Sequence, residues 1–305
     1  PVFTFASADV GTGIAITTTG YTISGADAGN YTLTQPGLSA DINPLTLVVE
    51  ADAQTKVYGS ADPSLTYQVT SGSLIGSDAF SGSLTRISGE TVGTYEITQG
   101  SLGLNSNYDL SYISNDLTIS KATITVTADN QTKIYGAADP ALTVSYSGFE
   151  NGDSELDLGG TLNISRNSGE AVGSYVISAS GATSTNYDIT YIAGSFEIIP
   201  AALTITADDQ TKVYGESDPA LTVSYSGFEN GDSESDLGGT LSVIRATGEG
   251  VGSYVISASG VTSMNYDITY VAGSFEITPA ALTITADDQT KVYGESDPAL
   301  TVSYS

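Results

Sequence analysis

Residues 200–226 read PAALTITADDQTKVYGESDPALTVSYS, and the same 27 residues return unchanged at 279–305. Looser copies occupy residues 45–69 and 122–147. A Lys-Val/Ile-Tyr-Gly core therefore begins at Lys56, Lys133, Lys212 and Lys291, at intervals of 77, 79 and 79 residues. Self-similarity at a fixed period is the sequence signature of repeat architectures. The sequence predicts an array of small modules rather than one large domain.

The period divides the chain into whole repeats and partial units. We expect repeats at residues 44–121, 122–200 and 201–279, and the start of a fourth at residues 280–305. Residues 1–43 differ from the repeats but share an Asn30-Tyr31 pair and an exit through Ile42 and Pro44. We expect the C-terminal part of a related β domain there, and a natural chain longer than these 305 residues.

Within a repeat, apolar and polar residues alternate with a period of two, which is typical of half-buried strands. In the third repeat the pattern predicts six strands, at 203–207, 221–225, 240–245, 253–258, 266–270 and 274–277. Gly-rich turns separate them, and no helical stripe exceeds one turn. The predicted fold is all-β: a tandem array of small antiparallel, immunoglobulin-like β-sandwiches. A β-grasp-like unit is the alternative, disfavoured because no crossover helix is evident.

The connection between units is short. The last strand of the second repeat ends near residue 199, and the next unit starts at Leu203 after only Pro200-Ala-Ala. Proline fixes φ, and this connection is shorter than a flexible linker needs to be. We therefore expect the array to form an extended, semi-rigid rod.

Charge and composition narrow the class of partner. The chain has 8 Lys and Arg against 35 Asp and Glu, a formal net charge of -27, which argues against nucleic acid and anionic membrane surfaces as partners. It has no Cys and no His, which excludes disulfides, thiol chemistry and imidazole-based sites. The sequence contains no run of about 20 apolar residues, so it does not predict direct membrane insertion. The Thr/Ser/Gly/Asp-rich composition favours an extracellular chain.

Seven of the eight basic residues fall at positions locked to the repeat. Rare charges at fixed positions indicate a role inside each unit, such as ion pairs of Arg245 with Glu249 and of Lys212 with Asp218. The alternative is an isopeptide crosslink from Lys212 to Asn265, which requires a neutral, desolvated amine. The residues to which we assign structural roles are Lys56, Lys133, Lys212, Lys291, Arg86, Arg166, Arg245, Glu90, Glu170 and Glu249.

Acidic loops make Ca²⁺ the one metal ion that the sequence suggests. Two loops place carboxylates at positions 1, 3 and 5, but Ile164 and Val243 stand where an EF-hand needs its position-12 Glu. Calcium would then be held between loops, and a solvated acidic face is the alternative. The candidate ligands are Asp153, Glu155, Asp157, Asp232, Glu234, Asp236, Asp208, Asp209, Glu216 and Asp218.

Tyrosine is frequent, with 19 residues mostly at fixed repeat positions such as Tyr175, Tyr187 and Tyr191. Their period-two spacing favours packing between strands over a sugar-binding platform. An enzyme built from this composition would have to use paired carboxylates. Such a site repeated nearly verbatim every 79 residues, without a pocket-forming insertion, is not expected.

Four motifs recur in one order: Lys-Val-Tyr-Gly-x-x-Asp-Pro-x-Leu-Thr, Gly-Glu-x-Val-Gly-x-Tyr-x-Ile, Asn-Tyr-Asp-Ile-x-Tyr and Phe-Glu-Ile-x-Pro-Ala. This order resembles the MBG ("mostly beta, glycine-rich") repeat of large bacterial surface adhesins, and residues 1–43 resemble the tail of the YDG module. The resemblance implies an extracellular, bacterial cell-surface protein without catalytic residues. The first repeat departs from it at residues 76–82, Gly-Ser-Asp-Ala-Phe-Ser-Gly, where the others have an acidic loop.

Near-identical repeats favour a structural stalk that projects or links the binding regions of an adhesin or extracellular fibre. One alternative is a multivalent binding module for a glycan or matrix protein, although the loops at 148–152 and 227–231 each offer a single Phe. Another is a filament in which edge strands join other copies in a biofilm matrix. The charge of -27 opposes that association unless cations bridge the chains.

Overall fold

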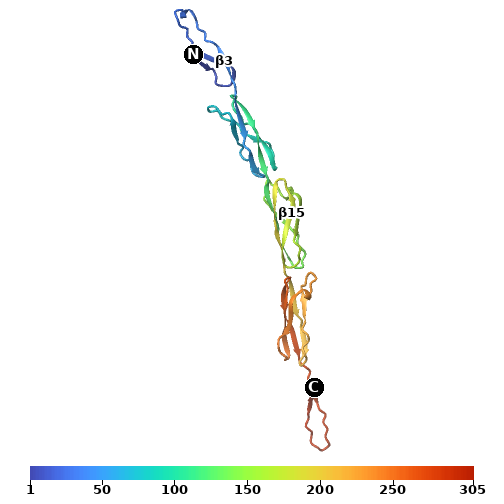
Figure 1. The fold of residues 1–305 in the computed structure, drawn as a ribbon. Helices are drawn as coiled ribbons and strands as arrows, with labels where there is room; N and C mark the ends of the chain where they lie inside the picture. Colours follow the sequence, from blue (N-terminus) through green and yellow to red (C-terminus); the bar gives the residue numbers. More distant parts are fainter. The chain divides into compact units, whose positions relative to one another are not determined.

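The structure, a computed structural model, describes residues 1–305 and confirms an all-β tandem array (Figure 1). Apart from three short 3₁₀ segments, every regular element is a strand. The chain divides into two compact units: residues 1–126 with 146–163 and 180–191, and residues 127–145 with 164–179 and 192–305. The division passes through the second repeat, so each unit contains one whole boundary between repeats.

Each whole repeat consists of a three-stranded and a four-stranded sheet. In the first repeat these are β6 (Tyr67–Ser71), β4 (Leu45–Ala51) and β9 (Tyr108–Ile113), and β5 (Gln54–Val57), β10 (Asn115–Ser120), β8 (Gly93–Thr98) and β7 (Thr85–Arg86), in spatial order. In the second they are β13 (Val144–Ser147), β11 (Ala122–Ala128) and β16 (Tyr187–Ile192), and β12 (Gln131–Ile134), β17 (Gly194–Ile199), β15 (Gly173–Thr183) and β14 (Gly159–Arg166).

The third repeat has the same order: β20 (Val223–Ser226), β18 (Ala201–Ala207) and β23 (Tyr266–Val271), then β19 (Gln210–Val213), β24 (Gly273–Thr278), β22 (Gly252–Thr262) and β21 (Gly238–Arg245). Residues 1–42 form one sheet, β1 (Val2–Phe5), β2 (Gly11–Thr19) and β3 (Leu38–Ile42). The last 26 residues form only the hairpin β25 (Ile284–Ala286) and β26 (Val302–Tyr304).

Two details differ from the sequence-based expectation. There are seven strands per repeat, because Gln210–Val213 of the Lys-Val-Tyr-Gly core is a strand in its own right. Lys212 points inward there and is 6% exposed, so the apolar alternation that marks a strand is broken. The sheets are also mixed: β18 pairs in parallel with β23, and β19 in parallel with β24, beside antiparallel neighbours. Such parallel pairs need the long connections that the rest of the repeat provides.

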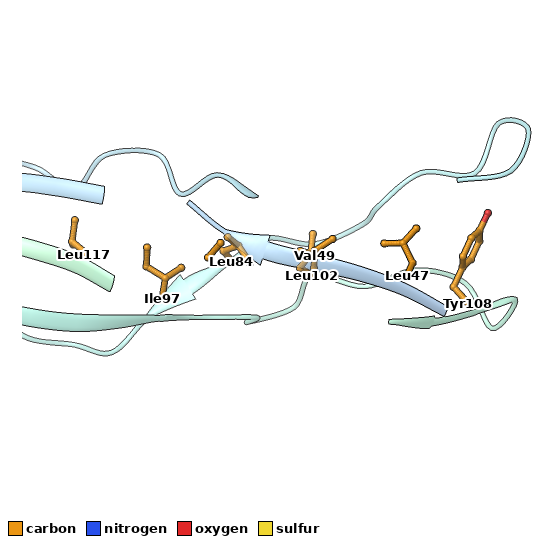
Figure 2. Close-up of a cluster of buried hydrophobic side chains, with 8 residues drawn as sticks. Leu47, Val49, Leu84, Ile97, Leu102, Tyr108 and Leu117 are labelled. Carbon is orange, nitrogen blue, oxygen red and sulfur yellow. The ribbon is translucent and has the colours of Figure 1, made fainter. Parts of the chain in front are cut away.

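The hydrophobic core of the first repeat is a narrow file of side chains. Figure 2 shows it following the strands from Leu117 at one end to Tyr108 at the other, with Ile97, Val49 and Leu47 between them. Leu47, Val49, Ile97 and Leu117 are 0% exposed. Full burial of each stabilises the fold by about 1.5–3 kcal/mol. Because the file is narrow, what lies at its two ends matters for each repeat.

The structure contains no helix with the length and hydropathy needed to span a lipid bilayer.

Candidate functional site at the junction between repeats

In the first two repeats, the tyrosine of the Lys-Val/Ile-Tyr-Gly core lies at the end of its repeat and bonds to the next one. In the first unit, the Tyr58 hydroxyl donates to Asp153 Oδ2 of the second repeat at 2.9 Å. The Tyr187 hydroxyl donates to the same oxygen at 2.7 Å and accepts the Glu150 backbone N–H at 2.9 Å. One half-buried carboxylate thus holds two tyrosines, one from each repeat.

The second unit repeats this arrangement between the second and third repeats. Tyr135 and Tyr266 donate to Asp232 Oδ2 at 2.9 and 2.8 Å, and the Glu229 N–H donates to the Tyr266 hydroxyl at 2.9 Å. Burial, and then the neighbouring carboxylate, raise the pKa of Tyr187 and Tyr266 to about 12. Both hydroxyls therefore stay protonated and remain donors near neutral pH.

Apolar packing continues across both boundaries. The Tyr58 and Tyr187 rings meet edge to face with centroids 5.3 Å apart, and Tyr135 and Tyr266 do so at 5.5 Å. Edge-to-face aromatic pairs add about 0.5–1.5 kcal/mol to the burial of their surface. The buried clusters themselves cross the repeat boundary: one joins Tyr58 and Ile119 to Ala122, Ile124 and Tyr187, and the other joins Ala128, Tyr135, Ile177, Phe196 and Ile198 to Ala201, Leu203 and Tyr266.

Backbone contacts complete the junction. The Val92 N–H donates to Asn186 Oδ1 at 3.2 Å, and the Val172 N–H donates to Asn265 Oδ1 at 3.1 Å. The glycine after each junction tyrosine has a positive φ, and a Cβ added at Gly136 would lie 2.4 Å from the Cβ of Glu229 in the next repeat. The Tyr-Gly pair is therefore needed both for the backbone conformation and for the close approach of the neighbouring repeat.

Alanine substitutions of the glycines that follow the core tyrosines distinguish the requirement for a positive φ from the requirement for close approach of the next repeat. Gly215 has a φ of +90°, but nothing lies within 4 Å of a Cβ built there, whereas Gly136 has a φ of +82° and meets Glu229. We expect Gly215→Ala to cost about 1 kcal/mol from backbone strain alone. Gly136→Ala should cost at least about 1 kcal/mol more, because the neighbouring repeat must shift. Thermal melting of the two full-length variants measures the difference; equal losses would show that the approach of Glu229 is unimportant.

A four-residue ion network lies beside each junction tyrosine. In the second repeat, Lys133 Nζ donates to Asp139 Oδ1 at 2.7 Å and to Glu170. Arg166 donates to Asp139 Oδ2 at 2.6 Å and to Glu170 at 2.5 Å, which closes the ring. The Lys133 side chain is 4% exposed and Asp139 is 39% exposed, so the ring has one buried side and one in water. The equivalent rings are Lys56, Asp62, Arg86, Glu90 and Lys212, Asp218, Arg245, Glu249.

The network fixes the segments that carry the junction. The lysine stands two residues before the junction tyrosine, and the glutamate two residues before the valine whose N–H binds the next repeat. The arginine lies over aromatic rings, with Arg166 Cζ 4.7 Å from the Phe196 centroid, a cation–π contact. Both ion pairs suggested by the sequence, Arg245 with Glu249 and Lys212 with Asp218, are present.

The network shifts the ionisation of its aspartates. Hydrogen bonds from the arginine, and then from the lysine, lower the pKa of Asp62, Asp139 and Asp218 to about 2, from an ordinary value of 3.8. Burial alone would lower the pKa of Lys133, but its bonds to Asp139 and Glu170 outweigh this and raise it. All members therefore stay charged at neutral pH.

These shifts predict an acid-sensitive stability. Because the folded-state pKa of each aspartate lies below its unfolded value, the stabilisation is fully present above about pH 4 and is lost as the pH falls toward 2. Urea midpoints of the full chain at pH 5, 4, 3 and 2 should fall only across the lower part of this series. The series is measured at high salt, which screens the repulsion among the surface carboxylates. Otherwise the relief of that repulsion on protonation would mask the loss of the ion networks. Asp139→Asn should flatten the fall, and a midpoint unchanged down to pH 2 would contradict the assignment.

The structure gives the candidate calcium ligands separate partners. Asp153 and Asp232 hold tyrosines, Asp157 and Asp236 cap the 3₁₀ turns at Ser154 and Ser233, and Asp218 belongs to an ion network. Asp208 accepts from Thr222 and Ser224, Asp209 from the Ser274 N–H, and Glu216 from the Val213 N–H. Glu155 and Glu234 lie exposed on those 3₁₀ turns. No three acidic groups converge into a metal-binding cluster.

Calcium binding therefore stays a prediction, and melting of the full chain with calcium, magnesium or chelator at equal ionic strength tests it. A ligand that binds only the folded state must raise the melting temperature. A rise with calcium alone would establish an ion site, and coincident curves would leave the acidic surface as solvation and repulsion.

Other sequence-based candidates take part in packing. Asn265, considered for a crosslink to Lys212, binds the Val172 backbone, while Lys212 is held as a charged amine by two carboxylates. The single Phe of each loop packs on a tyrosine of its own repeat that lies at the junction. The ring centroids of Phe149 and Tyr187 are 5.8 Å apart, and those of Phe228 and Tyr266 are 5.7 Å apart. The sequence does not indicate the contact between Tyr58 and Asp153, since partners 95 residues apart in the chain carry no local signal. The one available signal is the recurrence of the tyrosine and of the loop aspartate at fixed positions of the repeat.

The first repeat keeps this arrangement despite its different loop. Its Asp78 Oδ2 accepts the Tyr108 hydroxyl at 2.8 Å, and the Ile75 N–H donates to that hydroxyl at 2.8 Å. The Val10 N–H of the preceding module donates to Asn107 Oδ1 at 2.8 Å, as Val92 does to Asn186. The loop differs in sequence, but its Asp78 accepts from Tyr108 as Asp153 accepts from Tyr187.

Comparison with solved structures finds multidomain β chains at low similarity. Sidekick-1 immunoglobulin domains 1–4 share 12% identity over 82% of this chain and 79% of that chain, with a TM-score of 0.27. Drosophila N-cadherin EC1-4 shares 10% identity over 78% and 73%, with a TM-score of 0.22, and domains 4–9 of the surface layer protein SbsC share 12% over 74% and 44%, with a TM-score of 0.20. At these scores the likeness carries no argument about function. No curated protein matches the chain.

Family comparison gives a firmer result. A YDG domain matches residues 1–38, and the MBG domain (YGX type) matches residues 47–118, 124–197, 203–276 and 282–305. Because the MBG matches cover most of its length, the chain belongs to the MBG domain family and carries these domains in tandem.

Proposed function

We propose that the chain is a structural stalk of a bacterial cell-surface adhesin or extracellular fibre, whose repeats project or link binding regions. The junction supports this most strongly. Consecutive repeats share buried clusters and a tyrosine–aspartate–tyrosine contact, where a flexible linker would leave none. An array joined in this way resists bending at each boundary, which is the property a spacer needs.

Charge and chemistry agree with a non-catalytic, extracellular role. The formal net charge of -27 keeps neighbouring chains apart in solution. The carboxylates whose pKa values are lowered to about 2 are Asp62, Asp139 and Asp218. Each belongs to a closed ion network and does not face a cleft. A site of that kind stabilises a fold and offers no free acid or base for catalysis.

Small-angle X-ray scattering of the full chain tests the stalk. We expect the scattering of a stiff, elongated particle, and a smaller radius of gyration when Asp153→Ala and Asp232→Ala are combined. A wild-type chain that scatters as a flexible or compact particle would refute the proposal.

The alternative of a multivalent binding module has less support, because the aromatic side chains of the loops are packed at the junctions. A glycan array probed with the full chain distinguishes the two roles. Absence of binding to every glycan on the array favours the stalk, whereas specific, saturable binding to one of them would favour the binding module.

A further inference from the structure

The first and last strands of a whole repeat run side by side in the same direction. In the third repeat the chain enters through β18 and β19 and leaves through β23 and β24. β18 pairs in parallel with β23 over six residues, and β19 pairs in parallel with β24 over four. Ala201, where the chain enters, lies opposite Tyr266, and Thr278, where it leaves, lies opposite Val213. The entry and the exit therefore lie at opposite ends of the paired strands.

Further hydrogen bonds join the same strands at both ends and at the crossover between the two sheets. At the entry, the Ala201 N–H donates to a carbonyl of the loop before β23 at 3.0 Å. At the exit, the Tyr214 N–H donates to the Thr278 carbonyl at 2.8 Å. At the crossover, the Ser274 N–H donates to Asp209 Oδ1 at 2.7 Å. The first and last strands are thus bonded from one end of the repeat to the other.

A pulling force on the chain acts along these strands. It draws the start of β18 in one direction and the end of β24 in the other. Because the strands are parallel and are loaded at opposite ends, they separate only by sliding, and the hydrogen bonds of the pairing share the load. If a strand pair were loaded at one end, its bonds would break one after another. The sliding geometry therefore presents the higher barrier, and this barrier sets the rate of forced unfolding.

The ion network adds a contact that resists the same motion. Lys212 lies on β19 with its side chain 3% exposed, and its Nζ lies 2.7 Å from Asp218 and 2.5 Å from Glu249. Glu249 belongs to the segment that joins β21 and β22, on the far side of β24 from β19. Sliding of β19 along β24 would pull Lys212 away from Glu249.

We propose that the parallel strand pairs make a whole repeat a mechanical clamp, so that the array bears pulling force without unfolding. This goes beyond a stalk that only sets a distance, and it rests on the proposed stalk only for the source of the force. The first repeat is built in the same way: β4 pairs in parallel with β9 over six residues and β5 with β10 over four, and Lys56 binds Glu90. The clamp belongs to the single repeat, so a flexible junction would refute the stalk and leave the clamp to be judged by its own test.

Optical tweezers applied to the full chain test the clamp. Because the chain has no cysteine, two introduced cysteines fix where the force acts. Ala202→Cys with Ala280→Cys loads the third repeat at opposite ends. Ala202→Cys with Met264→Cys loads β18 and β23 at the same end, because Ala201 lies opposite Tyr266. All three substituted residues are exposed. At one loading rate, the opposite-end pair should unfold at a several-fold higher force than the same-end pair, and equal forces would overturn the clamp.

Lys212→Met tests the contribution of the ion network. It should lower the unfolding force in the opposite-end geometry and leave the same-end force unchanged, because β18 separates from β23 before β19 is loaded. Thr211→Ala, exposed on the same strand, is the matched control and should alter neither force. An equal fall in both geometries would overturn the role of the network in the clamp. The comparison of the two geometries keeps the network intact, so it does not depend on how well the Lys212→Met chain folds.

Discussion

Asp153→Ala is expected to lower the stability of the first junction by about 3 kcal/mol. The substitution leaves the hydroxyls of Tyr58 and Tyr187, which are 6% and 2% exposed, without their shared acceptor. An unsatisfied buried polar group costs about 1–3 kcal/mol; Tyr58 loses its only acceptor, whereas Tyr187 keeps a longer bond to the Glu150 carbonyl at 3.2 Å. For domains of this size, about 1 kcal/mol corresponds to a shift of roughly 4–8 °C in melting temperature.

The loss should appear on both sides of the repeat boundary. Thermal melting of the full chain measures its size, and hydrogen exchange locates it, with faster exchange expected at residues 54–60 and 92–97. Glu155→Ala is the matched control, because Glu155 is exposed on the 3₁₀ turn two residues away and should change stability by less than about 0.5 kcal/mol. An Asp153→Ala chain that melts with the control would show that the carboxylate does not hold the repeats together.

Asp139→Ala is expected to destabilise the second repeat by about 2–4 kcal/mol, because it removes one of two anions from a buried ammonium. Lys133 would keep only Glu170, and Arg166 would lose its bonds to Asp139. The expected value lies below that for a fully buried pair, since Asp139 itself is 39% exposed and partly screened by water. Denaturant midpoints of the full chain measure the loss.

Two further variants test whether the network around Lys133 contributes more to stability than an ordinary surface ion pair. Lys121 and Asp188 lie 3.6 Å apart with exposed side chains, so Asp188→Asn should cost less than about 0.5 kcal/mol. Adding Lys133→Met to Asp139→Ala should recover part of the stability, because it removes the under-compensated buried charge. If Asp139→Ala behaves like Asp188→Asn, the network is a surface feature.

The sequence predicts most of the architecture because the repeat makes local patterns easy to compare. Alternation located six of the seven strands of the third repeat, and fixed basic residues suggested the pairs Lys212–Asp218 and Arg245–Glu249. The strand it missed, β19, carries a lysine at an inward position. An inward charge looks polar in any hydrophobicity pattern, and only its carboxylate partners in the fold explain it.

The junction could not be predicted for a different reason. Tyr58 and Asp153 are 95 residues apart, and nothing in either local sequence indicates that they meet. The sequence suggested metal binding for Asp153 because three carboxylates alternate in its loop. In the structure each of the three has a different environment, and the one nearest the boundary holds tyrosines. Residue type and spacing indicate which groups are available, whereas the pairing of distant strands decides which of them meet.

If the junction holds neighbouring repeats at a fixed orientation, two spin labels placed on either side of it lie at one distance, which pulsed electron spin resonance measures. The chain has no cysteine, so Thr118→Cys in the first repeat and Thr190→Cys in the second, both exposed on strands of the same compact unit, would be the only labelled positions. We predict one narrow distance peak in the otherwise unchanged chain and a broad one when Asp153→Ala is added. A broad distribution in the chain with Asp153 intact would contradict the account.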